Sequence, residues 1–485
     1  MILSELIKNI EIVELLGSKD VTISDIQFDS RAVVKNSLFV AVRGFNVDGH
    51  AFIAKAIDLG AAVIVCEEIP ENISNSVTYI LVKDSSDTLG KLAANYYDNP
   101  TDDIKIIGIT GTNGKTTIAT LLYKTFQKLG YKVGLVSTIE NYIDNEVIPS
   151  THTTPDQIKL QELFSKMVDK GCDYCFMEVS SHSIHQHRIS GIKFDGGVFT
   201  NITHDHLDYH KTFKEYINVK KAFFDILDKS AFAITNIDDK NGEYMLQNSS
   251  AKHYTYALSS PADYKAKILE HHFSGMLLSI NNKEVWTKFI GKFNAYNLSA
   301  IYATAVQLGQ DENEVLTILS ELNAVNGRFE HFVSEENITA IVDYAHTPDA
   351  LQNVLSTINE IRTGNESLIT VVGAGGNRDK TKRPEMAKIA ADLSDRLILT
   401  SDNPRFENPI KIIQEMEVGV EALMRRKLLS ITDRKEAIKA ACMFAQSGDI
   451  VLIAGKGHET YQDVEGVKHH FDDKEIVKEQ LNIKE

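Results

Sequence analysis

The clearest chemical signal in the chain is a lysine at the end of a short glycine-rich segment. This segment reads Gly111-Thr112-Asn113-Gly114-Lys115-Thr116-Thr117. Glycines let backbone N–H groups close around phosphate oxygens, and the dipole of a following helix favours the anion. We therefore predict that Lys115 contacts the β- and γ-phosphates of a nucleotide and that the Thr116 hydroxyl binds Mg²⁺. The usual P-loop has another glycine where Ile109 stands, so this is a shortened variant; an ordinary glycine-rich turn is the alternative.

Three side chains could form a magnesium site next to this segment. Glu178, His206 and the Thr116 hydroxyl make a credible set, because Mg²⁺ takes few protein ligands, mostly oxygens, and keeps waters and phosphates. An imidazole ligand is less typical for Mg²⁺. Two alternatives stay open: a solvated polar loop, or a transition-metal cluster made of His204, Asp205, His206, Asp208 and His210.

Charged residues also gather where later strands are expected to end. Arg328, Asp343 and His346 lie at an expected domain junction, a common place for ligand sites. Farther along, the chain has Arg383, Arg405, Lys456, His458 and Glu459, which together could hold a zwitterion through its carboxylate and its ammonium. Taken singly, each is more often a surface charge, and Lys220 and Lys221 fit a solvated helix face equally well.

The elements that must position these residues indicate an α/β protein of three domains. Residues 1–100 read as a small α/β unit, with strands near 37–42 and 61–66 and a helix over 51–59. Residues 101–329 alternate strands and helices, which predicts a mostly parallel sheet with ligands beyond the carboxyl ends of its strands. Residues 330–485 repeat this alternation and predict a Rossmann-like unit.

Composition narrows the functional classes. The 485 residues carry a formal net charge of −16, which argues against a nucleic-acid surface. No apolar run approaches the roughly 20 residues of a membrane helix, and the N-terminus does not read as a signal peptide. Cys172 and Cys175 fall in an expected strand and should point to opposite faces, so we expect reduced cysteines in a cytoplasmic protein.

Together the motifs resemble the Mur ligase family, the ATP-dependent amide-forming enzymes of peptidoglycan precursor synthesis. The resemblance covers essentially the whole chain. Its segments are 111–117, 178–182, 204–208, 294–297, 327–330 and 343–346. Further segments, 29–31, 153–154, 186–188, 375–383 and 455–459, resemble the members that add the third residue of the stem peptide, and Asp402-Asn403-Pro404-Arg405 resembles the motif of those that select meso-diaminopimelate.

The resemblance implies a role for each matching residue. The phosphate segment, Asn294, Arg328 and Asp343 would bind ATP, while Glu178 and His206 would hold Mg²⁺ and Lys220 would be carbamylated and act as a further metal ligand. Ser30 would contact the UDP-sugar. The muramoyl-dipeptide would be bound by Thr153, Thr154, Ser180, Gln186 and Arg188, and diaminopimelate by Arg383, Asp402, Asn403, Pro404, Arg405, Gly455 and Glu459.

The implied reaction joins meso-diaminopimelate to the D-Glu of UDP-MurNAc-L-Ala-D-Glu through an acyl phosphate. Lys115, Lys220 and His206 would be its catalytic residues, and the expected form is a monomer. The alternatives are a lysine-adding member of the family, a ligase resembling folylpolyglutamate synthetase, or a P-loop regulatory NTPase. The last of these would have no need of Arg383, Arg405 and Glu459.

Overall fold

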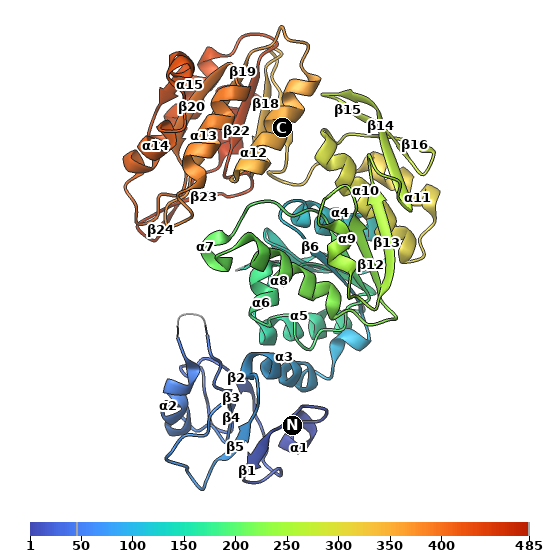
Figure 1. Cartoon of the computed structure of the whole chain (residues 1–485), viewed down its shortest axis with the longest axis vertical. Coiled ribbons are helices and arrows are strands. Elements are labelled where there is room, and N and C mark those ends of the chain that lie inside the picture. The colour runs from blue at the N-terminus through green and yellow to red at the C-terminus, as the bar shows by residue number, and fades with distance from the viewer. Residues whose placement is uncertain (45–46, 151, 484–485) are drawn as a thin grey trace.

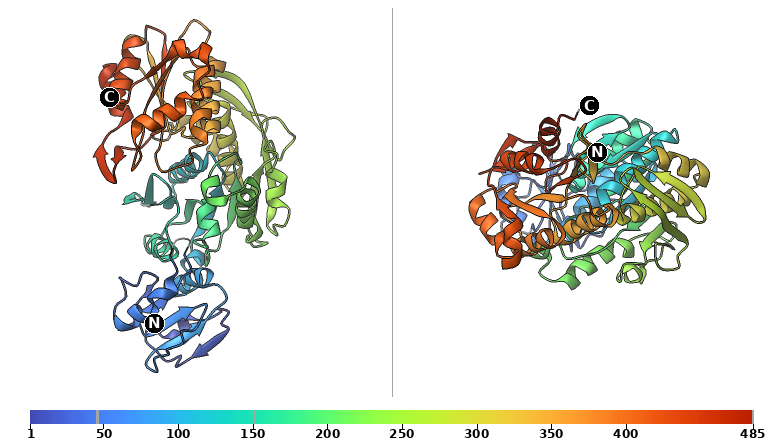
Figure 2. Two further views of the ribbon diagram at one scale, coloured as in Figure 1. Left: turned by 60° about the vertical axis from the view of Figure 1, so that its left-hand side comes forward. Right: turned by 90° about the horizontal axis from the view of Figure 1, so that it is seen from above.

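The chain folds into three α/β domains that follow one another along an elongated molecule (Figures 1 and 2). A computed structural model describes residues 1–44, 47–150 and 152–483, with Leu207 and Asp208 described by their backbone alone. The first domain lies at one end, the central domain in the middle and the third domain at the other end (Figure 1). Within the described residues, no helix combines the length and the apolar character needed to cross a bilayer.

The first domain is one sheet with a hydrophobic core on each face. Within the described residues the strand order is β1-β5-β4-β3-β2, with β1 antiparallel to β5 and the other pairs parallel. Its elements are α1 (Leu3–Leu6), β1 (Glu14–Leu16), β2 (Ile26–Gln27), β3 (Leu38–Val40), η1 (Gly49–Phe52), α2 (Ile53–Asp58), β4 (Val63–Cys66), β5 (Thr78–Leu81) and α3 (Ser85–Tyr96). The helix expected over 51–59 begins later, because Asp48 accepts from the His50 N–H and closes a 3₁₀ turn first.

The central domain is built on a sheet whose middle strands are parallel, as expected. In the described part of the chain this sheet has the order β16-β15-β14-β13-β12-β11-β6-β10-β7-β8-β9. Its parallel core consists of β6 (Lys105–Thr110), β7 (Val133–Val136), β10 (Tyr174–Glu178), β11 (Gly196–Phe199), β12 (Phe232–Asn236) and β13 (Lys252–Ala257). Except for β13, these strands are largely apolar and buried, as expected where helices cover both faces of a sheet.

Helices and antiparallel hairpins complete this domain. The helices, with the 3₁₀ turn η2, are η2 (Pro100–Asp102), α4 (Lys115–Lys128), α5 (Gln157–Asp169), α6 (Ser181–His185), α7 (Leu207–His210), α8 (Phe213–Asp225), α9 (Gly242–Leu246), α10 (Lys292–Gln307) and α11 (Glu312–Glu321). The edge strands are β8 (Glu140–Ile143), β9 (Glu146–Pro149), β14 (Tyr264–His272), β15 (Gly275–Ile280) and β16 (Lys283–Thr287). The hairpins at both edges are absent from the sequence prediction.

The third domain is a Rossmann-like unit with the strand order β17-β18-β22-β19-β20-β21 among the described residues. All pairs except β17–β18 are parallel. Its elements are β17 (Glu330–Val333), β18 (Thr339–Asp343), α12 (Pro348–Ile361), β19 (Leu368–Ala374), α13 (Lys382–Leu393), β20 (Arg396–Ser401), α14 (Pro409–Glu417), η3 (Ala422–Lys427), β21 (Leu428–Ser430), α15 (Arg434–Phe444), β22 (Ile450–Ala454), β23 (Tyr461–Val464), β24 (Val467–His470) and α16 (Asp473–Gln480). The β23–β24 hairpin extends from the third domain at the edge that faces the central domain (Figure 1).

The four cysteines are free and buried, as expected, but the argument from alternating faces is wrong. Cys172 lies before β10, in a turn where its N–H donates to the Met167 carbonyl (2.9 Å). Strand alternation therefore does not reach it, and Cys172 and Cys175 pack in the same hydrophobic core.

Candidate active site at the junction of the central and third domains

The glycine-rich segment is held in a fixed shape between β6 and α4. Gly111 and Gly114 adopt φ of 149° and 91°, which favour glycine. A Cβ on Gly111 would lie 1.9 Å from the Thr200 hydroxyl oxygen, so the tight approach also requires glycine. The Thr112 N–H donates to the Asn201 carbonyl (2.9 Å). The segment is therefore a preformed loop at a helix N-terminus, which is the geometry that binds phosphate.

Two lysine side chains meet at this loop. Lys115 donates to the carbonyls of Gly111 (2.9 Å) and Thr112 (2.8 Å), and Lys220 donates to the same Gly111 carbonyl (2.8 Å). Lys220 comes from α8 and is only 1% exposed, so the solvated helix face is wrong for it. Burial lowers the pKa of both ammonium groups, and for Lys220 the nearby Lys115 charge lowers it further. Lys221, its neighbour, is also buried and pairs with Asp225 (2.6 Å), so the solvated helix face is wrong for it as well.

Glu178 has the property expected of a metal ligand. It lies at the end of β10 and is 1% exposed; one carboxylate oxygen accepts from the Thr138 N–H (2.7 Å). The other oxygen, Oε2, is buried without a hydrogen-bond partner among the described residues. A buried, unpaired carboxylate oxygen is costly unless a cation or a donor arrives, so the site fits a divalent ion.

His206 places an imidazole near the ammonium groups of Lys115 and Lys220, whose charges both act to lower its pKa. It has a φ of 54°, and its ring packs edge-on to His182 with centroids 5.0 Å apart. Burial lowers the pKa of His206 to about 3, so its imidazole is neutral and able to bind a metal. Among the described residues the transition-metal cluster is not formed: His210 turns to the Ser181 hydroxyl (2.9 Å), and no group of three or more His, Cys, Asp or Glu side chains could hold a metal ion. The side chain of Asp208 lies outside the described part of the chain.

Four of the five residues expected to bind the dipeptide meet beside Glu178. Arg188 donates to the Thr154 carbonyl (3.0 Å) and to the side-chain oxygen of Gln186 (2.6 Å). Thr154 donates to the Glu178 carbonyl (2.9 Å) and lies 3.4 Å from the Ser180 hydroxyl. Thr153, the fifth, accepts from the Thr138 hydroxyl (3.1 Å), next to the same carboxylate.

Ser30 stands apart from this group, in the first domain. It is buried, and it lies between β2 and β3. Helix α3 joins that domain to the dipeptide-side residues, because Ser86 donates to the Gln186 carbonyl (2.9 Å). The first domain therefore reaches the central one next to the expected peptide site.

The domain junction brings Arg328 against the phosphate loop. Its guanidinium donates to the Thr116 hydroxyl (3.2 Å) and lies over the Tyr344 ring at 4.5 Å. Asp343 accepts from the N–H groups of Phe329 (2.6 Å) and Ala345 (2.7 Å), and burial raises its pKa to about 6. Asn294 is buried near the start of α10 and donates to the Ile290 carbonyl (2.8 Å).

Most of the expected amino-acid ligands converge at the carboxyl ends of β20 and β22. Asn403 donates to Glu459 (2.7 Å), and Lys456 donates to both of these side chains (3.1 and 3.2 Å). A Cβ on Gly455 would lie 2.8 Å from the Asp402 carboxylate, so glycine lets these two loops touch. Pro404 and Arg405 follow, and the Arg405 N–H donates to the Asp463 carbonyl (3.0 Å) in the β23–β24 hairpin.

Arg383 is the exception in this group. Its side chain is fully buried, and its guanidinium donates to both oxygens of Glu407 (3.0 Å each) and to the Gly375 carbonyl (3.1 Å). It also pairs with Glu415. The arginine therefore lies beneath the group rather than at its surface.

Sequence reasoning missed several residues that shape this site. Asp349, at the start of α12, accepts from Asn113 of the phosphate loop (2.8 Å) and from Thr203 (3.2 Å), and so connects two domains. Gln462 of the hairpin donates to the Asp402 carbonyl (2.7 Å). Neither contact has a local sequence signal, because both join residues far apart in the chain.

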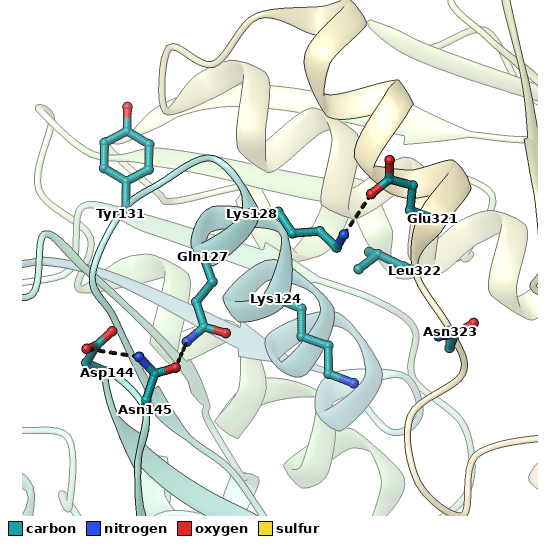
Figure 3. A pocket seen from close by; sticks show the side chains of 9 residues that line it. All are labelled: Lys124, Gln127, Lys128, Tyr131, Asp144, Asn145, Glu321, Leu322 and Asn323. Carbon is teal, nitrogen blue, oxygen red and sulfur yellow. Dashed lines mark hydrogen bonds and ion pairs between the residues drawn. The ribbon is translucent and has the colours of Figure 1, made fainter.

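A separate surface pocket of about 480 Å³ lies toward the other end of α4 (Figure 3). Lys124 and Lys128 of α4 border it, and Lys128 pairs with Glu321 (2.7 Å). None of the described residues that line it belongs to the expected sites.

The chain matches three family models, one in each domain. They are described as "Mur ligase family, catalytic domain" (residues 22–97), "Mur ligase middle domain" (109–305) and "Mur ligase, glutamate ligase domain" (327–457).

Among known proteins, the chain is 58% identical to the UDP-N-acetylmuramoyl-L-alanyl-D-glutamate–2,6-diaminopimelate ligase of Bacteroides thetaiotaomicron, over 99% of this chain and 100% of the relative. A solved structure of a ligase with the same name superposes with a TM-score of 0.71 at 31% identity, covering 99% of both chains. The MurF ligase of Thermotoga maritima, solved in complex with ADP, shares the fold with a TM-score of 0.63 at 20% identity, over 96% of this chain and 99% of that one.

Proposed function

Because the chain belongs to the Mur ligase family, we propose that it joins meso-diaminopimelate to the D-Glu carboxylate of UDP-MurNAc-L-Ala-D-Glu with consumption of ATP. The observation that carries this proposal is the group formed in the third domain, beside the β23–β24 hairpin, by Asp402, Asn403, Arg405, Gly455 and Glu459. It offers a cation for a carboxylate and anions for an ammonium, as an amino-acid substrate requires.

The reaction begins with a carboxylate. A carboxylate is a poor electrophile because its oxygen is a poor leaving group. Transfer of the γ-phosphoryl group of ATP to the D-Glu carboxylate gives an acyl phosphate, and attack by the amine of diaminopimelate then forms the amide and releases phosphate. The preformed loop and Lys115 would hold the transferring phosphoryl group and offset its charge. Arg328, at the Thr116 hydroxyl, would add a second positive charge on the side of the third domain.

A divalent ion, when bound, neutralises charge on the phosphates and aligns them. Mg²⁺ would be held by the unpaired oxygen of Glu178, by His206 and by the Thr116 hydroxyl. Lys220 as a cation would repel a metal, whereas its carbamate would be an anionic oxygen ligand. Its buried amine, with a pKa well below the usual value, suits that modification.

The remaining substrates would be shared between the first two domains. Thr153, Thr154, Ser180, Gln186 and Arg188 would bind the muramoyl-dipeptide next to Glu178, and Ser30 would contact the UDP-sugar. We expect the chain to work as a monomer in the cytoplasm, where these nucleotide substrates are found.

Selectivity would come from Arg405. Diaminopimelate carries one carboxylate more than lysine, and an arginine can pair with it through two hydrogen bonds. When lysine binds, that arginine is left without its partner, so discrimination can be large.

Phosphate release tests the proposal directly. The assay contains the chain, ATP, Mg²⁺ and UDP-MurNAc-L-Ala-D-Glu, with meso-diaminopimelate or L-lysine as the second substrate. Release with diaminopimelate and only traces with lysine is the expected result. Equal or faster release with lysine would make the chain a lysine-adding ligase, whereas release that ignores both amino acids would indicate another ligase substrate or a regulatory NTPase.

A further inference from the structure

Two loops of the third domain touch at the proposed amino-acid site. The glycine loop, residues 375–381, joins β19 to α13, and the recognition loop, residues 402–408, joins β20 to α14. The Gly376 N–H donates to the Asn403 carbonyl (2.9 Å), and the Arg405 guanidinium donates to the Gly376 carbonyl (2.8 Å). The conformation of the glycine loop therefore determines where the Arg405 side chain lies.

Arg405 is held in an unfavourable backbone conformation. Its φ is 51°, in the left-handed region, which is strained for a non-glycine residue and persists only where the surroundings enforce it. On one side the β23–β24 hairpin enforces it, because the Glu465 N–H donates to the Arg405 carbonyl (2.8 Å). The recognition loop is also restrained where it leaves Arg405 toward α14, because the Phe406 N–H donates to the Asn377 side chain (3.0 Å).

Glu407 anchors this second restraint. Its carboxylate accepts from the Asn377 N–H (2.5 Å) in the glycine loop and from both terminal nitrogens of the buried Arg383. Lys380, also in the glycine loop, lies 3.1 Å from the same carboxylate. Asn377 in turn accepts from the Phe406 N–H (3.0 Å). One side chain thus ties both loops to the start of α13.

We infer that Glu407 is a positioning residue for Arg405, and that Arg383 holds the Glu407 carboxylate in place. The inference rests on the proposed function, since it assigns Arg405 to substrate recognition. The Arg383 side chain is fully buried, and its guanidinium donates to the Glu407 carboxylate, the Gly375 carbonyl and the Glu415 carboxylate. Arg383 fixes the carboxylate, the carboxylate fixes the two loops, and the loops fix the guanidinium of Arg405.

The chain offers a matched control in Glu415. This second carboxylate pairs with the same Arg383 from α14, but among the described residues it reaches the glycine loop only through the exposed Lys380 side chain, at 3.9 Å. Glu407→Gln and Glu407→Ala remove the proposed restraint, whereas Glu415→Gln changes a charge on Arg383 and leaves the loop contacts in place.

Two measurements on the full chain test whether Glu407 positions Arg405. In steady-state assays, Glu407→Gln should raise the KM for diaminopimelate about tenfold with a smaller change in kcat, and should lower the preference for diaminopimelate over lysine by a similar factor. The KM for ATP should stay the same. In hydrogen–deuterium exchange without substrates, the amides of residues 376–377 and 405–406 should exchange faster in both Glu407 variants than in Glu415→Gln or the unmodified chain.

Each outcome bears on a different claim. Unchanged exchange in the Glu407 variants, or equal effects in Glu415→Gln, would overturn the positioning role whatever the substrate is. A uniform fall in activity with the amino-acid preference intact would also overturn it, because that pattern indicates general destabilisation. Failure of the unmodified chain to release phosphate with diaminopimelate would instead overturn the proposed function, and the exchange data would still report whether Glu407 joins the loops.

Discussion

Lys220 and Lys221 are neighbours in sequence with opposite surroundings. The Lys221 ammonium pairs with Asp225 (2.6 Å), whereas the hydrogen bonds of Lys220 within the described residues go to neutral oxygens, the Gly111 carbonyl and the Thr110 hydroxyl. Burial disfavours the charged form of Lys220 and lowers its pKa. Carbamylation requires the neutral amine, which attacks CO₂, forms an N–C bond and releases a proton. The environment of Lys220 therefore favours the reactive form.

We expect Lys220 to carry a carbamate when CO₂ is present. With ¹³C-labelled bicarbonate near pH 7, a carbamate carbon signal should appear in the NMR spectrum of the unmodified chain and of Lys221→Gln, and should be missing from Lys220→Ala. An ordinary lysine, with a pKa of about 10.4, is almost fully protonated at this pH, so the lowered pKa is what permits the reaction. Lys220→Ala should also lose about 100-fold or more in kcat. A signal that survives in Lys220→Ala would refute the assignment.

Arg405 should control the choice of amino acid. Arg405→Ala should lower kcat/KM for diaminopimelate by about 100-fold and change kcat/KM for lysine by less than about tenfold, because only diaminopimelate has the carboxylate that the guanidinium pairs with. Arg405→Lys should give a kcat/KM for diaminopimelate between those of the unmodified chain and Arg405→Ala, since an ammonium cannot form the bidentate contact with a carboxylate. Arg426→Ala, an exposed arginine of η3 in the same domain, is the control and should leave both substrates unaffected. Equal losses for both amino acids would argue against a role in selectivity.

At the scale of elements, the site depends on loops that approach more closely than side chains allow. A Cβ on Gly376 would lie 1.9 Å from the Pro404 carbonyl oxygen, so this contact between the glycine and recognition loops excludes even alanine. The loops are short connections between buried parallel strands and helices, and they cannot separate without moving β19 or β20.

Gly376→Ala should therefore weaken amino-acid binding and destabilise the third domain. We expect a cost of about 1–3 kcal/mol, typical of overpacking, and a higher KM for diaminopimelate. Gly364→Ala is the comparison: a Cβ there meets no atom within 4 Å, but φ is 92°, so its cost is backbone strain of about 1 kcal/mol with no effect on KM. Thermal unfolding and the KM for the amino acid measure both variants. An unchanged KM in Gly376→Ala would mean that the loops tolerate separation.

The elements differ in how far the sequence could predict them. The buried parallel strands were predictable because each is a short apolar run between turns, and β3 and β4 lie within two residues of the expected bounds, 37–42 and 61–66. The β15–β16 hairpin was missed, although Asn281-Asn282, with φ of 48° and 64°, is a readable hairpin turn.

The residues of the site also differ in how far the sequence could predict their arrangement. The phosphate loop is local in sequence, so its shape follows from its glycines. The burial of Arg383, the pairing of Arg405 with the β23–β24 hairpin and the contact of Asp349 with Asn113 depend on segments brought together by folding. A single sequence holds no periodicity or turn chemistry that reports such pairings.

At the scale of the whole molecule, an acidic side chain of the third domain contacts the phosphate loop of the central domain. Asp349 accepts from Asn113 and Thr203, and this contact, with the packing of Arg328 over the Tyr344 ring, joins the two domains. A nucleotide in the loop would bring negative phosphates near this carboxylate. At an effective dielectric constant of about 20, two unit charges about 8 Å apart repel by about 2 kcal/mol. Nucleotide binding should therefore loosen the Asp349 contact and change the orientation of the third domain.

Asp349→Asn keeps the shape of the side chain and removes this repulsion. We expect it to bind ATP several-fold more tightly in a titration at low salt, with the difference from the unmodified chain shrinking as salt screens the charges. In small-angle scattering, ATP should change the profile of the unmodified chain more than that of the variant, because the amide of the variant has no charge for the phosphates to repel. Asp392→Asn, at an exposed residue of α13, removes the same charge away from the loop and should alter neither measurement. If Asp349→Asn and Asp392→Asn bound ATP alike, the carboxylate would be a static contact between domains, and domain movement would need another cause.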